Sequence, residues 1–226
     1  MNQRLRTALP FVAGAVFVLL MLLVEKGWQP GYWGKSACKL AVTAAILAVG
    51  CAAERLPLRE AIFLRPLPKA GRLAAFVAAA FVGIWVGFWL LRGRFDLDGI
   101  RTRLMTKEHL TRENCLFVFG YIIVVNSFLE EALFRGYLVH AAARAGHRTA
   151  GIVYSALAFA VYHIGIMESW MHPALLVLLV AGLAAVGAAL TWVSLHFGSL
   201  KAGWLVHAGA NVAINSIGAW MIFTGG

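Results

Sequence analysis

Long apolar stretches alternate with short polar segments along the chain. A helix that crosses a membrane needs roughly 20 mostly apolar residues. Seven stretches approach this length, at residues 8–24, 36–53, 72–91, 114–140, 149–167, 173–195 and 200–222. A shorter apolar piece at residues 60–68 leaves room for one more segment that dips into the membrane. The pattern predicts an all-α fold, a polytopic transmembrane helical bundle of seven to eight spans.

The composition agrees with a chain that lies in lipid. Of its 226 residues, 61% are hydrophobic and 13% are charged, whereas an ordinary soluble domain has about 25% charged residues. We therefore expect a multi-pass integral membrane protein that is surrounded by the lipid bilayer.

The formal net charge of +10 raises the question of a nucleic-acid partner. The basic residues occur in short runs between apolar segments, mainly at residues 4–6, 55–72 and 92–112. Such runs are typical of loops near anionic lipid headgroups. No nucleic-acid motif accompanies them, so we expect no nucleic-acid partner.

The same charges predict an orientation. Arg4, Arg6 and the five positive charges of residues 55–72 favour a cytoplasmic N-terminus. The connection at residues 92–113 would then lie outside despite its six Lys and Arg residues, unless another segment is re-entrant. The later part of this connection could form an amphipathic helix on the membrane surface. No small-x-small cleavage site follows the first span, so we predict that this span is not removed.

Charged and polar residues interrupt three of the last four spans. They are Glu130, Glu131 and Arg135 in the fourth span, His163 in the fifth, and His207, Asn211 and Asn215 in the seventh. A charge at the centre of a membrane helix costs about 2.5–3.5 kcal/mol on insertion scales, so a chain keeps few of them without a use.

Helical spacing assigns these side chains to faces. Residues four apart share a face, so Glu131 and Arg135 are expected to form an ion pair. Glu130 points elsewhere, on the face of Asn126, and is predicted to have no partner. An unpaired carboxylate in a medium of low dielectric takes up a proton readily, which suits a general base.

The other two spans repeat this spacing. Phe159 and His163 share a face, as do His207 and Asn211. A cavity formed by the last four helices would then hold one free carboxylate, two imidazoles and an amide donor, a set that can activate water and stabilise an oxyanion. The alternative is a structural one, in which these polar groups only join helices.

Three motifs occur in order on these helices. The stretch "EEALFRGYL" resembles EExxxR, "FAVYH" resembles FxxxH and "HAGAN" resembles HxxxN. Together they resemble the CAAX protease and bacteriocin-processing enzyme (CPBP) family of glutamic intramembrane proteases, over roughly residues 114–216. Hydropathy assigns residues 1–113 to N-terminal transmembrane helices with an interfacial loop, and the resemblance implies that residues 114–226 form a catalytic helical core.

The resemblance also implies roles for the residues that match. Glu130 would activate water with the help of His163, while His207 and Asn211 would stabilise the oxyanion. Glu131, held by Arg135, would orient the site, and no metal or other cofactor would be needed. Phe134, Tyr137 and Phe159 are candidates for a substrate groove, although packing is an equally simple role for each.

Several alternatives stay open. Zinc could be bound by Glu130, His163 and His207, because two histidines and a glutamate can ligate it. Non-proteolytic immunity or chaperone-like relatives and a proton-coupled transporter are the other functional candidates. The expected substrate is a membrane-tethered protein segment, such as a C-terminal sorting signal, a leader or a CAAX-type tail. The expected location is a prokaryotic cytoplasmic (inner) membrane.

Overall fold

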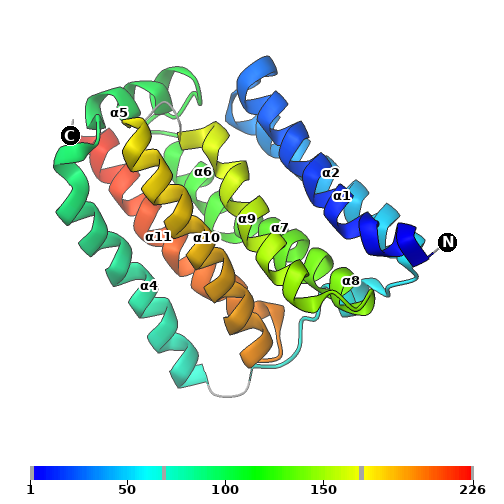
Figure 1. Ribbon diagram of the computed structural model, residues 1–226. Helices are drawn as coiled ribbons and strands as arrows, with labels where there is room; N and C mark the ends of the chain where they lie inside the picture. Colours follow the sequence, from blue (N-terminus) through cyan, green and yellow to red (C-terminus); the bar gives the residue numbers. More distant parts are fainter. Residues whose placement is uncertain (1–2, 68–69, 168–170, 225–226) are drawn as a thin grey trace.

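A computed structural model of the chain describes residues 3–67, 70–167 and 171–224, and within them it is a bundle of helices (Figure 1). Seven helices of this described part are long and apolar enough to cross a membrane. They are Arg4–Trp28, Gly31–Glu54, Gly71–Arg94, Cys115–Arg144, Arg148–Met167, Pro173–His196 and Leu200–Thr224. The helical fold and the seven spans predicted from hydropathy are confirmed.

Most spans consist of one α-helix. These are α1 (Gln3–Leu23), which continues as the π-helical η1 (Val24–Trp28), and then α2 (Gly31–Glu54), α4 (Ala70–Leu91), α9 (Arg148–Met167), α10 (Pro173–His196) and α11 (Leu200–Thr224). A short 3₁₀ turn, η2 (Arg92–Arg94), ends the third span.

The fourth span is different because two π-helical stretches interrupt it. Its segments are α6 (Cys115–Tyr121), η3 (Ile122–Asn126), α7 (Ser127–Glu130), η4 (Glu131–Leu138) and α8 (Val139–Arg144). The two π-helical stretches, η3 and η4, flank the turn that ends at Glu130. Extra residues of this kind re-aim side chains and occur frequently at functional sites.

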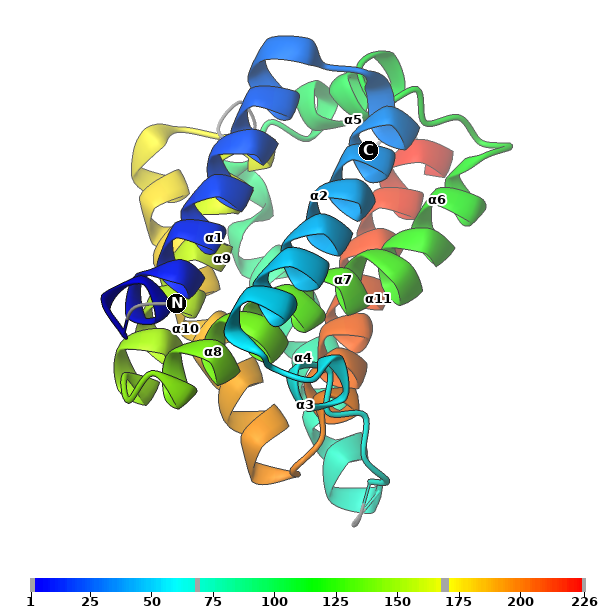
Figure 2. The same ribbon diagram turned by 90° about the vertical axis from the view of Figure 1, so that its right-hand side faces the viewer.

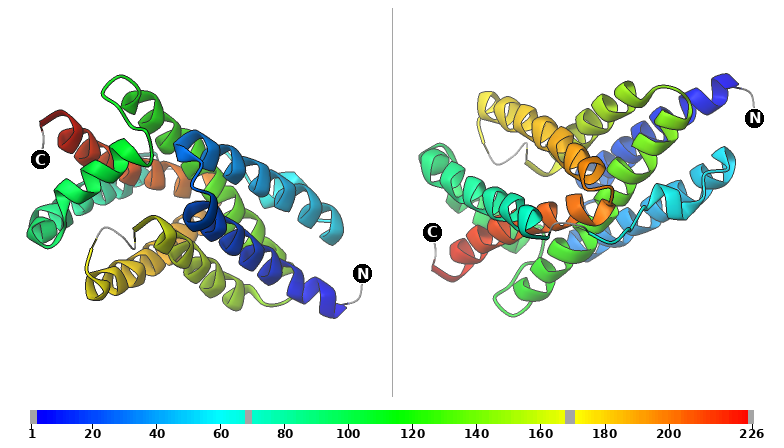
Figure 3. Two further views of the ribbon diagram at one scale, coloured as in Figure 1. Left: turned by 90° about the horizontal axis from the view of Figure 1, so that it is seen from above. Right: turned by 90° about the horizontal axis from the view of Figure 1, so that it is seen from below.

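The fourth span also runs through the middle of the bundle. Every residue of η4 is buried, and α1, α2, α9, α10 and α11 all pack against it. Figure 1 shows α1 and α2 at one edge and α4 at the opposite edge, and Figures 2 and 3 show the same arrangement from the side and along the bundle. Charged groups of η4 therefore lie in the protein interior and do not face lipid.

The apolar piece at residues 60–68 does not form an eighth span. Its described part contains one helical turn, α3 (Leu58–Ala61), followed by a non-helical segment; residue 68 lies outside the described residues. The start of α11 binds this segment, because Leu200 N–H donates to the Phe63 carbonyl at 3.1 Å and the Ser199 hydroxyl donates to the Arg65 carbonyl at 2.8 Å. The two carbonyl groups belong to a non-helical segment and therefore have no partner within a helix of their own. The donors at the start of α11 provide the hydrogen bonds that these backbone groups need.

The polar connection at residues 92–113 lies at the other end of the bundle from the N-terminus (Figure 1). It holds α5 (Leu97–Thr106), earlier in the connection than predicted. The helix begins there because the Asp96 side chain accepts from Gly99 N–H at 2.9 Å, as an N-cap. Its Ile100 is buried against Ile217 and Met221. With seven complete spans, this connection is an exception to the positive-inside rule if the N-terminus is cytoplasmic.

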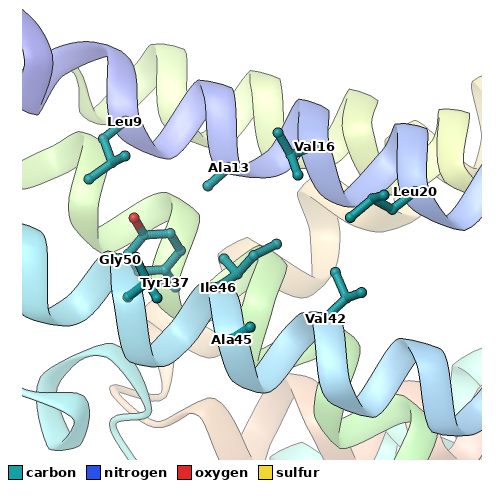
Figure 4. Close-up of a pocket in the computed structure, with 10 residues that line it drawn as sticks. Leu9, Ala13, Val16, Leu20, Val42, Ala45, Ile46, Gly50 and Tyr137 are labelled. Atoms are coloured by element: carbon teal, nitrogen blue, oxygen red, sulfur yellow. The ribbon is translucent and has the colours of Figure 1, made fainter.

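An apolar groove of about 280 Å³ separates α1 from α2 (Figure 4). Its lining residues are Leu9, Ala13, Val16 and Leu20 of α1, Val42, Ala45, Ile46, Val49 and Gly50 of α2, and Tyr137 of η4. Tyr137 lies against Gly50, where there is no room for a Cβ atom.

Close packing of α4 on α11 leads to a first prediction. A Cβ atom at Gly209 would lie 2.6 Å from Val77 Cγ1, so Gly209→Ala has to push the two helices apart. We expect a loss of about 1–3 kcal/mol in the free energy of unfolding, the usual cost of overpacking. Chemical denaturation in mixed micelles measures it. Gly83→Ala on α4 is the matched control, because nothing lies within 4 Å of its Cβ position. Equal stability of the two variants would contradict this packing.

Candidate active site

The six residues predicted to carry chemistry lie on three helices of the bundle. Glu130 ends α7, Glu131 and Arg135 belong to η4, His163 belongs to α9, and His207 and Asn211 belong to α11. Because α9 and α11 both pack on η4, the fold brings residues 77 positions apart, Glu130 and His207, to 3.7 Å between Oε2 and Nε2.

Glu131 is the centre of a buried charged cluster. Arg135 Nη1 lies 3.2 Å from Glu131 Oε1, which confirms the predicted ion pair within one helix. His207 Nδ1–H donates to the same oxygen at 3.0 Å. The guanidinium of Arg135 lies 4.1 Å from the centre of the Phe159 ring, and its Nη2 donates to the Gly187 carbonyl at 3.4 Å. Glu131 thus fixes the orientation of the His207 ring.

Glu130 is also buried, but the prediction that it has no partner is wrong. Its Oε1 accepts from Asn126 Nδ2 and from the Tyr162 hydroxyl, both at 3.0 Å, and from Lys39 Nζ at 3.1 Å. The face shared with Asn126 is as predicted. The cation comes from α2, far away in the sequence, so the spacing within one helix could not show it.

The two oxygens of Glu130 have different surroundings. Oε1 accepts three hydrogen bonds, whereas Oε2 is buried and accepts none from protein groups in the described part of the chain. Oε2 faces His207 Nε2 at 3.7 Å. The carboxylate therefore has one oxygen held in place and one oxygen with free lone pairs.

His163 is half-buried beside this carboxylate. Its Nδ1 lies 2.7 Å from the Phe159 carbonyl. A carbonyl oxygen can only accept, so Nδ1 carries the hydrogen and Nε2 of the neutral ring keeps a lone pair. Glu130 and His163 are close enough to interact electrostatically.

Asn211 lies one turn beyond His207 on α11. Its Nδ2 donates to the carbonyl of Ile122 at 3.3 Å, in the π-helical stretch η3. Trp204 of α11 binds the same stretch, because its Nε1 donates to the Val124 carbonyl at 3.0 Å. Two hydrogen bonds thus join α11 to the backbone just before the turn that ends at Glu130.

The comparison with protein families concerns this part of the molecule. Residues 112–213 match the family described as Type II CAAX prenyl endopeptidase Rce1-like. This part of the chain is similar to the CAAX proteases of that family. The match confirms the family resemblance seen in the three motifs, all of which lie inside it. Searches of curated proteins and of solved structures gave no match.

Lys39 lies outside the matched residues 112–213, and the sequence analysis did not identify it as a candidate. It was visible there as a lysine inside the predicted second span, where a charge costs about 2.5–3.5 kcal/mol on insertion scales. Tyr162 was also missed, although it stands inside the "FAVYH" motif. The predicted location of the site in the last four helices is therefore incomplete, because α2 contributes a charged side chain.

The three candidates for a substrate groove, which lie within the matched residues, are all buried. Phe134 and Phe159 pack edge to face, with ring centres 5.5 Å apart, and Phe159 supports Arg135. Tyr137 donates its hydroxyl hydrogen to Glu54 Oε1 at 2.8 Å and lines the groove between α1 and α2 (Figure 4). A role in substrate binding stays a prediction for all three.

The zinc alternative gains no support from this geometry. Among residues 3–67, 70–167 and 171–224, no three His, Cys, Asp or Glu side chains are grouped so that they could hold a metal ion. The cation that lies beside Glu130 Oε1 in the structure is the ammonium group of Lys39, 3.1 Å away.

Proposed function

We propose that the chain is an intramembrane peptidase that hydrolyses a peptide bond in a membrane-associated protein segment, with water activated by Glu130 and His163. The observation that carries this proposal is the Glu130 carboxylate, which has one oxygen bound by three donors and one oxygen free. A general base needs this combination of a fixed position and a lone pair that no protein donor occupies.

Each remaining group has a role that follows from its contacts. A water molecule bound at Glu130 Oε2 can pass its proton to the carboxylate while its oxygen attacks the carbonyl carbon. When the tetrahedral intermediate collapses and the C–N bond breaks, Glu130 returns this proton to the leaving amine. His163, with a free Nε2 lone pair, helps to orient this water. Proton transfer by positioned side chains contributes typically about 10²–10⁴-fold to a rate.

Stabilisation of the developing oxyanion falls to His207 and Asn211. Glu131 accepts from His207 Nδ1–H, which orients the ring so that Nε2 is directed into the site, on the side of Glu130 Oε2. The Asn211 amide is a further donor. When the substrate binds, its Nδ2–H leaves the Ile122 carbonyl and donates to the substrate oxyanion. Donors aimed at the oxyanion commonly contribute about 10²–10³-fold each.

The substrate class is proposed from the family and the setting. The site lies in the middle of seven apolar helices, so the substrate segment has to reach it from the membrane. A C-terminal sorting signal, a leader or a CAAX-type tail on a membrane-tethered protein meets this requirement. Location in a prokaryotic inner membrane is part of the same proposal.

The test uses the purified full chain in phospholipid vesicles with two probes. One is a farnesylated CAAX peptide and the other is a single-span membrane reporter without a prenyl group; mass spectrometry detects the products. We expect the wild type to cleave one of them, and His163→Ala to lower the rate by about 100-fold. His147→Ala is the matched control, because this exposed histidine lies outside the site.

Two results would contradict the proposal. Equal rates for wild type and His163→Ala would remove His163 from the mechanism. Loss of wild-type cleavage in the presence of 1,10-phenanthroline, with recovery on addition of zinc, would favour the zinc alternative.

A further inference from the structure

Lys39 is a charged residue of the second span, and its side-chain hydrogen bonds to the described residues all go to the surroundings of Glu130. Its ammonium group is 2.6 Å from Asn126 Oδ1 and 3.1 Å from Glu130 Oε1, and it also donates to the Tyr162 hydroxyl. The side chain is 13% exposed. Two of these partners, Asn126 and Tyr162, donate to the same oxygen, Glu130 Oε1.

We propose that Lys39 is a positioning residue for the catalytic base, and that α2 is therefore a functional part of the site. This inference rests on the proposed role of Glu130. The reason is geometric: Lys39 holds Oε1 directly, and it also holds the Asn126 carboxamide and the Tyr162 hydroxyl that donate to the same oxygen. With Oε1 bound on three sides, the carboxylate cannot rotate, and Oε2 stays directed towards His207.

Charge supports the same assignment. Two carboxylates, Glu130 and Glu131, lie side by side in the interior, and each has a cation of its own: Lys39 at 3.1 Å and Arg135 at 3.2 Å. A buried charge without a counter-charge is unfavourable. Lys39 thus allows Glu130 to remain an acceptor of protons next to a second carboxylate.

Lys35, one turn earlier on α2, shows what a structural lysine in this helix looks like. It is 14% exposed and lies 2.6 Å from Glu25 and 2.6 Å from Glu108, so it joins α1 to the connection near α5. Lys35 and Lys39 are similar in burial and in pairing with carboxylates. They differ in that Lys39 binds the base, which makes Lys35 a matched control.

The experiment compares Lys39→Met, Lys39→Arg and Lys35→Met in the vesicle assay. A base displaced by about 1 Å loses about 100-fold in rate, and this is the loss of kcat expected for Lys39→Met. Lys39→Arg, which keeps the charge and the donors, should recover at least a tenth of the wild-type rate. Lys35→Met should cleave at nearly the wild-type rate, even if it unfolds at a lower temperature.

The possible results separate this inference from the proposed function. If Glu130→Gln is inactive and Lys39→Met cleaves at the wild-type rate, the inference about Lys39 is wrong and the proposed function stands. If Lys39→Arg is as inactive as Lys39→Met, a positioning role through charge is wrong. If Glu130→Gln itself cleaves normally, the proposed function fails first.

A second measurement applies if Lys39→Met does not accumulate as a folded protein. Lys39→Gln keeps a donor without the charge, and its unfolding temperature is measured alone and in the Glu130→Gln background. If Lys39 and Glu130 interact, Lys39→Gln lowers the unfolding temperature less in the Glu130→Gln background than in the wild type. The reason is that the negative charge which Lys39 balances is already absent from that background. Equal decreases in both backgrounds would contradict the coupling between Lys39 and Glu130.

Discussion

Replacing Glu130 with glutamine is expected to lower the rate of peptide-bond cleavage by at least about 100-fold, the lower end of what a general base contributes. Glutamine has the shape of glutamate and can still accept at Oε1 from Lys39 and Tyr162. It cannot take a proton from water. The loss should therefore appear in kcat, as measured in the vesicle assay, while the protein remains folded.

The control for this variant is Glu113→Gln. Glu113 is an exposed carboxylate in the connection before α6, so its replacement changes the net charge in the same way without touching the site. A rate near that of the wild type for Glu130→Gln would remove Glu130 from the role of base. Size-exclusion chromatography in detergent checks that both variants are folded.

Replacing Arg135 with methionine is expected to destabilise the protein by about 3–5 kcal/mol, the usual cost of breaking a buried ion pair. The side chain is 1% exposed, and it balances Glu131, which is fully buried. Without Arg135, the Glu131 carboxylate stays in the interior and keeps the hydrogen bond from the His207 ring but loses the guanidinium that balances its charge. Chemical denaturation in mixed micelles measures the change in the free energy of unfolding.

Arg144→Met is the matched control for Arg135→Met. Arg144 pairs with Glu60 at 3.3 Å, but both side chains are about half exposed, and such pairs contribute about 0–1 kcal/mol. The double variant Glu131→Gln with Arg135→Met should recover part of the loss, since it leaves no unbalanced charge. If Arg135→Met and Arg144→Met were equally stable, the claim that the buried pair of Glu131 and Arg135 stabilises the fold would be contradicted.

Hydropathy was sufficient to predict the seven spans, because each crosses the membrane as a nearly continuous apolar helix. The four-residue spacing was sufficient to predict the pair of Glu131 and Arg135 and the helix face that Glu130 shares with Asn126. These are local properties, which depend on neighbours within one or two turns.

Contacts between distant helices could not be predicted in this way. Lys39 meets Glu130 because α2 packs on η4, and no periodicity within either helix contains that information. The absence of Lys39 from the predicted site led to the incorrect expectation of an unpaired Glu130. A count of charged residues over all seven spans, and not only over the last four, would have drawn attention to it.

The π-helical stretches were also outside the reach of the sequence. The assignment of faces assumed 3.6 residues per turn throughout the fourth span, whereas η3 and η4 depart from this on both sides of Glu130. The predicted pair of Glu131 and Arg135 is nevertheless present, because residues four apart still lie close together on the surface of the wider helix.

The Lys39 contact also changes the view of how the chain is organised. The proposed division into residues 1–113 and a catalytic core at residues 114–226 places every motif in the second part. If Lys39 has the proposed role, the first part contributes more than membrane anchorage, since α2 then holds the base in place.

The central claim is that the chain cleaves membrane-associated proteins through Glu130. The most direct test compares the N- and C-termini of membrane and secreted proteins from cells that carry the wild type or Glu130→Gln. We predict a defined set of termini that are present with the wild type and lost with the variant, and this set would name the substrates. No changed terminus, with the variant present at normal levels, would contradict the claim and favour a non-proteolytic immunity or chaperone-like protein or a proton-coupled transporter.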